Sequence, residues 1–261
     1  MRIAMGIEYR GTHFLGWQRL RQGRSVQAVV EAAISKVANH KVTTACAGRT
    51  DSGVHAHYQV VHFDTDAQRD NHSWVFGCNS NLPRDVSVLW ALPVADSFHA
   101  RFSATGRTYC YCILNRVARP GLLDGLVTWE CRPLDVERMQ KAAEPLKGEH
   151  DFSGYRALAC QSKSPVRHVR RIELSQLAER IVITVEANAF LHHMVRNIAG
   201  VLMSIGKHKA SVEWPAQILA GRDRTAGGVT APAAGLYLVA IDYPDWPALP
   251  APPLAAWPAW E

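Results

Sequence analysis

Long apolar runs, a signal peptide and paired cysteines are all missing from this sequence. No stretch approaches the roughly 18 to 20 apolar residues that cross a bilayer, and the start, MRIAMGIEYR, lacks the apolar core of a signal peptide. The six cysteines are scattered over 261 residues, and none belongs to a CxxC pair. We therefore expect a soluble, unexported protein, cytoplasmic in location, whose cysteines are reduced core thiols.

Motifs for metals and nucleotide cofactors are missing as well. His55 and His57 are two residues apart and His192 and His193 are adjacent, which fits neither an HExxH helix nor a zinc ribbon nor a zinc deaminase. GxGxxG, GxxxxGK[ST] and GxSxG do not occur. The sequence thus predicts no metal and no cofactor, and it gives no support to phosphoryl transfer or to a hydrolase triad.

Acidic residues are absent from three long stretches, residues 97–123, 152–172 and 187–212, in a chain whose formal charge is +6. Arginine binds phosphate, and tyrosine offers a face on which a base can stack. A single cluster of this kind fits a solvated strand face equally well, but three clusters in a basic protein favour nucleic acid as the partner. The basic and aromatic residues of the first two stretches are Arg101, Arg107, Tyr109, Tyr111, Arg116, Arg119, Arg156, Lys163, Arg167, Arg170 and Arg171.

Hydrophobic periodicity predicts a chain of alternating strands and helices. Residues 1–9 alternate apolar and small or polar side chains, as a half-buried strand does, and Ser25 is a plausible N-cap for the helix that follows it. Expected strands are 1–9, 43–47, 59–63, 86–92, 105–114, 169–174, 180–188 and 235–243; expected helices are 26–37, 73–80, 135–144 and 191–205.

The order of these elements occurs twice along the chain. Because helices do not separate the strands in strict βαβ order, the pattern disfavours a doubly wound parallel sheet and favours an α+β fold with a mainly antiparallel or mixed sheet. We predict an N-terminal half at 1–98, a C-terminal half at 99–244 and a tail at 245–261, rich in Pro, Ala and Trp, that lies on the surface.

The segment from residue 47 to residue 56 combines turn residues with one carboxylate. Asp51 before Ser52 and Gly53 is typical of an Asx turn or a cap. Arg49 also stands two residues before Asp51, so a charge-assisted contact would keep the carboxylate ionised and oriented. The residues alone leave both interpretations open.

Short motifs spread over nearly the whole chain occur in a distinctive order. GRTD at 48–51 is followed by GVHA at 53–56 and QV at 59–60; further motifs are GWQ at 16–18, RTYCY at 107–111, FLHHMVRN at 190–197 with Gly200, AP at 231–232 and GLYL at 235–238. Together they resemble the bacterial tRNA pseudouridine synthase A family. The resemblance implies a cofactor-free isomerase that converts uridine to pseudouridine in the anticodon stem-loop of tRNA, at positions 38, 39 and 40.

The same resemblance implies a fold and a set of site residues. The fold is two ferredoxin-like halves, similar to RNA-recognition modules, that share a mainly antiparallel mixed sheet with helices on one face and a central active-site cleft; the protein is a homodimer whose partner is tRNA. By this likeness Asp51 is the nucleophile, Arg49 pairs with it and helps to displace the base, Tyr109 stacks on the uracil or assists proton transfer at C5, Leu236 packs against the base, and Arg107 and Arg196 bind substrate.

Several alternatives accompany this assignment. Tyr109 and Leu236 also suit a protein core, and attack at C1′, attack at C6 and a glycal route fit the sequence equally. A noncatalytic RNA-binding protein in which Asp51 only caps a turn is the rival function, whereas a tRNA methyltransferase would need a glycine-rich cofactor loop. The chain departs from the family pattern at Leu15, at Ser52 beside the nucleophile and at 228–229, where Gly-Val replaces Gly-Pro.

Overall fold

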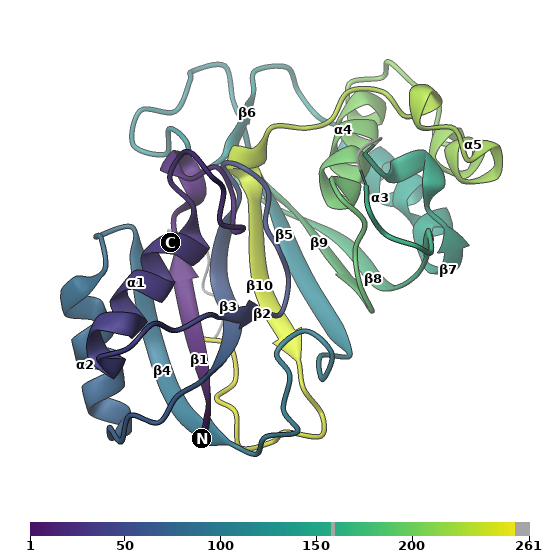
Figure 1. The fold of residues 1–261 in the computed structure, drawn as a ribbon. Coiled ribbons are helices and arrows are strands. Elements are labelled where there is room, and N and C mark those ends of the chain that lie inside the picture. The colour runs from purple at the N-terminus through teal and green to yellow at the C-terminus, as the bar shows by residue number, and fades with distance from the viewer. Residues whose placement is uncertain (158–159, 254–261) are drawn as a thin grey trace. The chain divides into compact units, whose positions relative to one another are not determined.

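A computed structural model describes residues 1–157 and 160–253 and divides the chain into two compact units (Figure 1). The first unit comprises Met1–Thr105 together with the chain from Leu238 onward, and the second comprises Gly106–Tyr237. The expected boundary at 98/99 thus lies before the observed change of unit. The expected C-terminal half also included the last strand, most of which belongs to the first unit because the chain returns there at Leu238.

The elements follow the predicted order closely, with short additions. The strands are β1 (Arg2–Tyr9), β2 (Ala45–Cys46), β3 (His55–Asp64), β4 (Val86–Val94), β5 (Gly106–Asn115), β6 (Thr128–Glu130), β7 (Gly148–Asp151), β8 (Val166–Leu177), β9 (Arg180–Ala187) and β10 (Leu236–Asp242). The α-helices are α1 (Val26–Ala38), α2 (Asn71–Asn81), α3 (Val136–Ala143), α4 (Met194–Gly206) and α5 (Trp214–Gly221), and short 3₁₀ turns include η1 (Gly11–His13).

In the first unit β1 is a central strand. It pairs antiparallel with β3 on one side and with β4 on the other. Ile3, Met5 and Ile7 are buried as expected, but Ala4 is buried too, and a side chain at Gly6 would overlap the indole of Trp90. The prediction of a half-buried strand is therefore wrong: small residues let the second face of β1 be covered as well.

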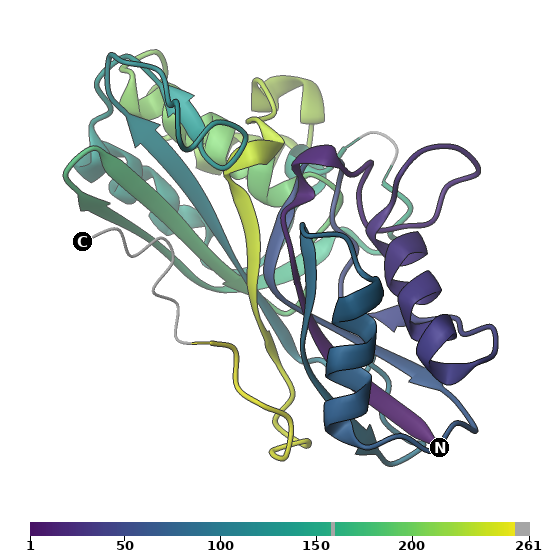
Figure 2. The same cartoon turned by 90° about the vertical axis from the view of Figure 1, so that its left-hand side faces the viewer.

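The first unit has the ferredoxin-like order of elements. Its strands follow the order β4-β1-β3, with the short β2 and the end of β10 beside β3, while α1 follows β1 and α2 follows β3. The two helices pack against each other on one side of the strands (Figure 2). Helix α1 begins after Ser25, as predicted, and ends at Asn39 in the left-handed conformation that commonly closes a helix.

The second unit repeats this pattern. Strand β5 is followed by α3, then by the hairpin of β8 and β9, then by α4, and the strands run in the order β5-β9-β8-β7. All these pairs are antiparallel, whereas β6 pairs parallel with β5. Helix α3 packs on α4 and on β8. The predicted α+β class with mixed, mostly antiparallel strands is confirmed.

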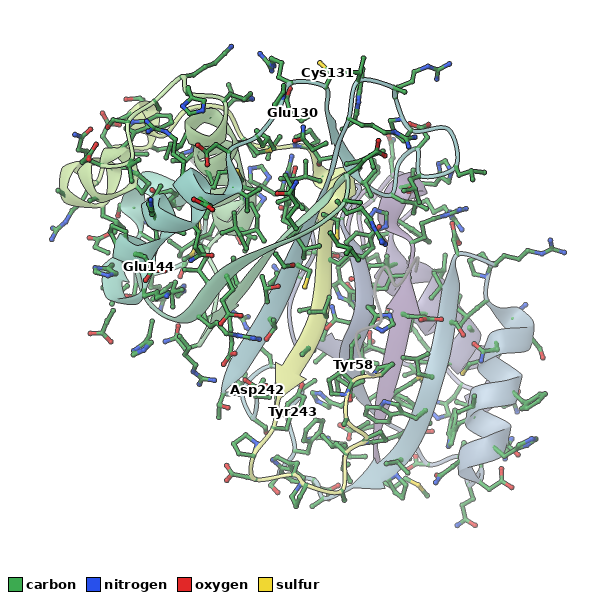
Figure 3. The ribbon with its side chains drawn as sticks, turned by 180° about the vertical axis from the view of Figure 1, so that it is seen from behind. Tyr58, Glu130, Cys131, Glu144, Asp242 and Tyr243 are labelled. Carbon is green, nitrogen blue, oxygen red and sulfur yellow. The ribbon has the colours of Figure 1, made fainter. Side chains whose placement is uncertain are left out.

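Two observations concern the expected location of the protein: the state of its cysteines, and the length and polarity of its helices. All six thiols are free, but Cys131 is exposed, so the expectation of core thiols is wrong for that residue (Figure 3). Burial raises the pKa of Cys46, Cys78 and Cys112 to about 12, which makes these thiols unreactive. Over the part of the chain that the structure describes, every helix is too short or too polar to cross a membrane.

The segment after β10 runs along the first unit without forming a helix or a strand as far as residue 253. Trp246 packs edge-on against Phe98, with ring centroids 5.0 Å apart, and the hydroxyl of Tyr58 on β3 donates to the carbonyl of Pro250. Figure 3 shows this segment crossing the strands beside Tyr58. The remainder of the predicted tail, 254–261, lies outside the described residues.

A buried carboxylate, that of Glu130, lies at the last residue of β6 in the second unit. Glu130 is 6% exposed and accepts hydrogen bonds from Arg132 Nε at 2.8 Å and from Lys207 Nζ at 3.0 Å (Figure 3). Burial by itself would raise the pKa of Glu130, but the bonds from Arg132 and Lys207 lower it to about 2. Lys207 follows α4, so this cluster joins that helix to β6.

We expect Glu130→Gln to lower the free energy of unfolding at neutral pH by about 2 to 3 kcal/mol. A carboxyl whose pKa is depressed in the fold stabilises it above the unfolded pKa, near 4.5, and that contribution fades as the pH falls toward 2. Urea unfolding of both proteins across this range should therefore show a difference that shrinks with acidity. A difference independent of pH would mean that shape, not charge, matters at this position.

Candidate active site

Asp51 lies in a tight turn between β2 and β3. The buried side chain of Gln59 holds the start of the turn: its Nε2 donates to the Gly48 carbonyl at 2.6 Å, and its Oε1 accepts from the Gly48 amide at 3.4 Å. The Val54 amide donates to the main-chain oxygen of Asp51 at 3.1 Å, and Gly53 has φ = 76°, which favours glycine. The turn is therefore fixed at both ends.

The segment after η1 fixes the same turn from outside. The Trp17 amide donates to the Thr50 carbonyl at 3.0 Å, and the Gly53 amide donates to the Phe14 carbonyl at 3.2 Å. The hydroxyl of Ser52 also donates to the Phe14 carbonyl, at 3.3 Å. Ser52, which departs from the family pattern, thus makes a structural bond away from its neighbour's carboxylate.

The hydrogen bonds of the turn can be compared with the interpretation in which the Asp51 side chain only caps a turn. An Asx turn directs the amide two residues later to the aspartate side chain. That amide belongs to Gly53, and it donates to Phe14 instead. The hydrogen bond that closes the turn runs from the Val54 amide to the main-chain oxygen of Asp51. The half-buried carboxylate of Asp51 takes no part in this main-chain bond.

Arg49 lies at the start of the Asp51 turn. Its side chain is exposed, and among the described residues no ion pair joins it to the Asp51 carboxylate. An exposed pair gains little Coulomb energy in water and costs side-chain entropy, so a hydrated guanidinium is the expected state without a ligand. Arg49 is therefore placed beside the turn without being held by it.

Two predicted substrate-binding residues, Arg107 and Tyr109, lie on β5 in the second unit. Arg107 is 9% exposed, and its Nη1 donates to the Asn188 carbonyl at 3.1 Å. Tyr109 is 8% exposed and meets Phe190 edge-to-face, with centroids 5.0 Å apart. Both side chains thus contact the segment that leads from β9 into α4.

Tyr111 has a different environment from Tyr109. It is fully buried, and its hydroxyl is bonded to Thr128 Oγ1 at 2.6 Å and to the Pro232 carbonyl at 2.9 Å. Burial raises its pKa far above the usual value. Tyr111 is therefore a core residue that ties β5 to β6 and to the segment before β10.

The remaining predicted residues lie around that segment. Arg196 on α4 donates from Nε to the Ala231 carbonyl at 2.8 Å, while the Ala231 amide donates to the Arg196 carbonyl at 3.1 Å. A Cβ at Gly235 would lie 2.6 Å from the Cys112 carbonyl, so glycine lets the chain approach β5 closely. Leu236 follows at the start of β10 and is 5% exposed.

Asn197 was missed by the sequence analysis although it stands beside Arg196. It is 1% exposed; its Oδ1 accepts from Thr230 Oγ1 at 2.7 Å and from Arg224 Nη2 at 3.0 Å, and its Nδ2 donates to the Tyr155 carbonyl at 2.7 Å. A polar residue on the apolar side of a helix is the signal that identifies it. Asn197 holds the segment after α5 against α4.

The acid-free stretches of the sequence are not acid-free in space. Arg170 and Arg171 on β8 approach Glu186 on the neighbouring β9 at 3.5 Å, and Arg116 approaches Glu179 at 3.2 Å. Strand pairing places acidic residues next to these arginines although they lie outside the acid-free stretches of the sequence. Each of these arginines therefore has an acidic neighbour in the fold that the linear sequence did not show.

A fourth acid-free stretch escaped the sequence analysis. Between Tyr9 and Val30 the chain contains Arg10, Arg19, Arg21 and Arg24 and no Asp or Glu. This stretch includes the segment that fixes the Asp51 turn. Its signal was the same as that of the other three stretches.

Comparison with known proteins gives the family of this chain. A family model described as tRNA pseudouridine synthase matches residues 5–103 and 142–244. The chain is 56% identical over 259 residues to tRNA pseudouridine synthase A of Nitrosococcus oceani, covering 98% of this chain and 100% of that protein. The proteins of the same name from Vibrio cholerae and Escherichia coli O1:K1 are 53% and 52% identical, each over 97% of this chain and over 96% and 94% of their own lengths.

The relatives extend the match to residues 104–141, which the family model leaves out and which contain the whole of β5. Both matched regions of the model contain residues described above: the first holds the Asp51 turn, and the second holds Arg196 and Leu236. The chain therefore belongs to the tRNA pseudouridine synthase family.

Proposed function

We propose that this protein converts uridine to pseudouridine in tRNA, in the anticodon stem-loop at positions 38, 39 and 40, with Asp51 as nucleophile and without a cofactor. The observation that carries the proposal is the 52 to 56% identity, over nearly full length, to proteins named tRNA pseudouridine synthase A. The fixed turn around Asp51 supports it, because a nucleophile must be held in position before the substrate arrives.

The reaction needs little more than a positioned carboxylate. The C1′–N1 glycosidic bond breaks, the freed uracil rotates, a C1′–C5 bond forms, and the proton on C5 is lost while N1 gains one. Atoms and electrons balance within the nucleotide, so no redox partner and no energy source are required. The carboxylate of Asp51 provides the nucleophile.

The second unit contributes the groups that hold the substrate in this proposal. Tyr109 presents an aromatic ring for the uracil, Leu236 an apolar contact, and Arg107 and Arg196 cations for the RNA backbone. Arg49, exposed beside the Asp51 turn, is available to the RNA when the target base is displaced. We further propose a cytoplasmic homodimer that binds one tRNA across both subunits.

The direct test is incubation of the purified protein with an unmodified tRNA transcript, followed by mapping of pseudouridine. We expect product at positions 38 to 40 without added metal or nucleotide, and the same yield after treatment with a chelator. Product elsewhere in the tRNA would contradict the proposed site of modification. A chelator-sensitive reaction would contradict the proposed mechanism.

Tyr109→Ala is expected to lower kcat/KM by about 5- to 150-fold, because stacking of a base on an aromatic ring contributes about 1 to 3 kcal/mol. Tyr111→Phe is the matched control, since it removes hydroxyl bonds from a buried ring and should lower the melting temperature more than the turnover. Initial rates and melting curves of both variants decide the question. Losses that follow stability alone would assign Tyr109 to the core.

A further inference from the structure

The loop of residues 18–23 between η1 and α1 is shaped by its flanks. Leu15 N donates to the Arg24 carbonyl at 2.9 Å and closes the base of the loop. Arg24 then pairs with Asp85 through two bonds, at 2.6 and 2.7 Å, while its guanidinium lies 4.0 Å from the centre of the Phe14 ring. Arg24 is therefore used inside the protein.

The other arm of the loop is held in a similar way. The Arg19 amide donates to Gln27 Oε1 at 3.0 Å, and the Arg19 guanidinium is bonded to the buried carboxylate of Glu31 on α1. Two of the four arginines of this stretch thus serve as anchors, one on each arm. The tip is left between them.

The tip presents one leucine and one arginine to solvent. Leu20 is 47% exposed, and Arg21 is exposed and makes no hydrogen bond or ion pair with any residue that the structure describes. Figure 2 shows the loop before α1 extending away from the helix. The anchored loop thus places a large apolar side chain and a cation next to each other in the sequence and in contact with water, a combination that suits a nucleic acid.

The base of the loop is bonded to the turn of the nucleophile. Trp17 N donates to the Thr50 carbonyl at 3.0 Å, directly before Asp51. Leu20 follows three residues later, and three residues of extended chain span at most about 11 Å. The tip therefore lies within about 11 Å of Trp17, the residue that is bonded to the Asp51 turn, and this span is comparable to a few stacked nucleotides.

We propose that Leu20 inserts into the base stack next to the target uridine and that Arg21 binds the adjacent phosphate. Apolar wedges inserted between base steps unstack them, and enzymes that act on a base must first take it out of the stack. The loop thereby lowers the cost of exposing the uridine to Asp51. This inference rests on the proposed function and assigns the unstacking step to residues 20 and 21.

The test compares Leu20→Ser with the wild type on two tRNA transcripts. In one the uridine at position 39 pairs with adenosine, and in the other it faces cytidine and is already unpaired. We expect Leu20→Ser to lower the single-turnover rate constant about tenfold on the paired target. On the unpaired target the loss should be less than about twofold, since an unpaired base costs less to extrude. Leu20→Met, which keeps a large apolar side chain, should react at the wild-type rate. Leu177→Ser, at an exposed leucine of β8, is the matched control and should also react at that rate.

Arg21→Gln tests the second half of the proposal by equilibrium binding. The slope of log K against log salt should become shallower by about one, whereas Arg69→Gln, at an exposed arginine beyond the far end of β3, should leave it unchanged. Equal rates for Leu20→Ser and wild type on the paired target, or equal losses on both targets, would overturn the wedge. A wild type inactive on both transcripts would instead overturn the proposed function and this inference with it.

Discussion

Asp51→Asn is expected to abolish pseudouridine formation while leaving the fold and tRNA binding in place. Asparagine has nearly the same volume, and the bonds that fix the turn are made by the main chain and by Gln59, so the turn should persist. The amide cannot act as a nucleophile, so turnover should fall by at least about a thousandfold. Affinity for tRNA should stay within about tenfold, or rise, because a negative charge facing the RNA is removed.

Turnover, binding and a melting curve should be measured on the same preparation of this variant. Ser52→Ala is the matched control, since it removes the neighbouring hydroxyl bond to Phe14 and keeps the carboxylate. We expect it to keep most of the wild-type rate. Retained turnover in Asp51→Asn would remove the carboxylate from the mechanism.

Gly16→Ala is expected to damage both stability and catalysis. Gly16 has φ = 97°, and a Cβ there would lie 2.7 Å from the Thr50 carbonyl oxygen and 3.1 Å from the carbonyl carbon of Asp51. Relieving that overlap must move the turn of the nucleophile. We expect a loss of about 2 to 4 kcal/mol in unfolding free energy. A loss of at least about 100-fold in kcat should accompany it, because small displacements of a reacting group are costly.

Gly121→Ala provides the comparison, because a Cβ at Gly121 meets no atom within 4 Å. Chemical denaturation and single-turnover rates of the two variants separate a general effect of added side chains from a local one. If Gly16→Ala folds less stably but turns over at the wild-type rate at low temperature, the contact between the η1 segment and the Asp51 turn is not part of the site.

Regular elements with a strong period were predictable from the sequence. The strands at 86–92 and 180–188 and the helix at 135–144 correspond to β4, β9 and α3 within a few residues. Strands β6 and β7 were missed because three or four residues carry too little periodicity to recognise. Helix α5 was missed although it is as long as α3, because its apolar side chains are spread around the helix instead of lying on one face.

The candidate site was predictable as a set of residues but not as a set of contacts. Asp51 and Tyr109 could be named from short motifs, whereas the bonds of Gln59, Asn197 and Phe14 depend on residues brought together by the fold. The pairing predicted between Arg49 and Asp51 rested on closeness in sequence alone, and the side chain of Arg49 is exposed to water in the structure. Charge counted along the chain likewise missed the acids that pair with basic residues across strands.

The return of the chain at β10 affects how the protein can be made. Residues 238–242 pair beside β3, yet they are synthesised after the whole of the second unit. While the ribosome is still translating, most of one edge of β3 therefore has backbone groups without a neighbouring strand, and exposed edges of this kind invite pairing between nascent chains. The N-terminal unit becomes complete only at the end of translation, so a chain cut off before Leu238 loses part of the unit that was made first.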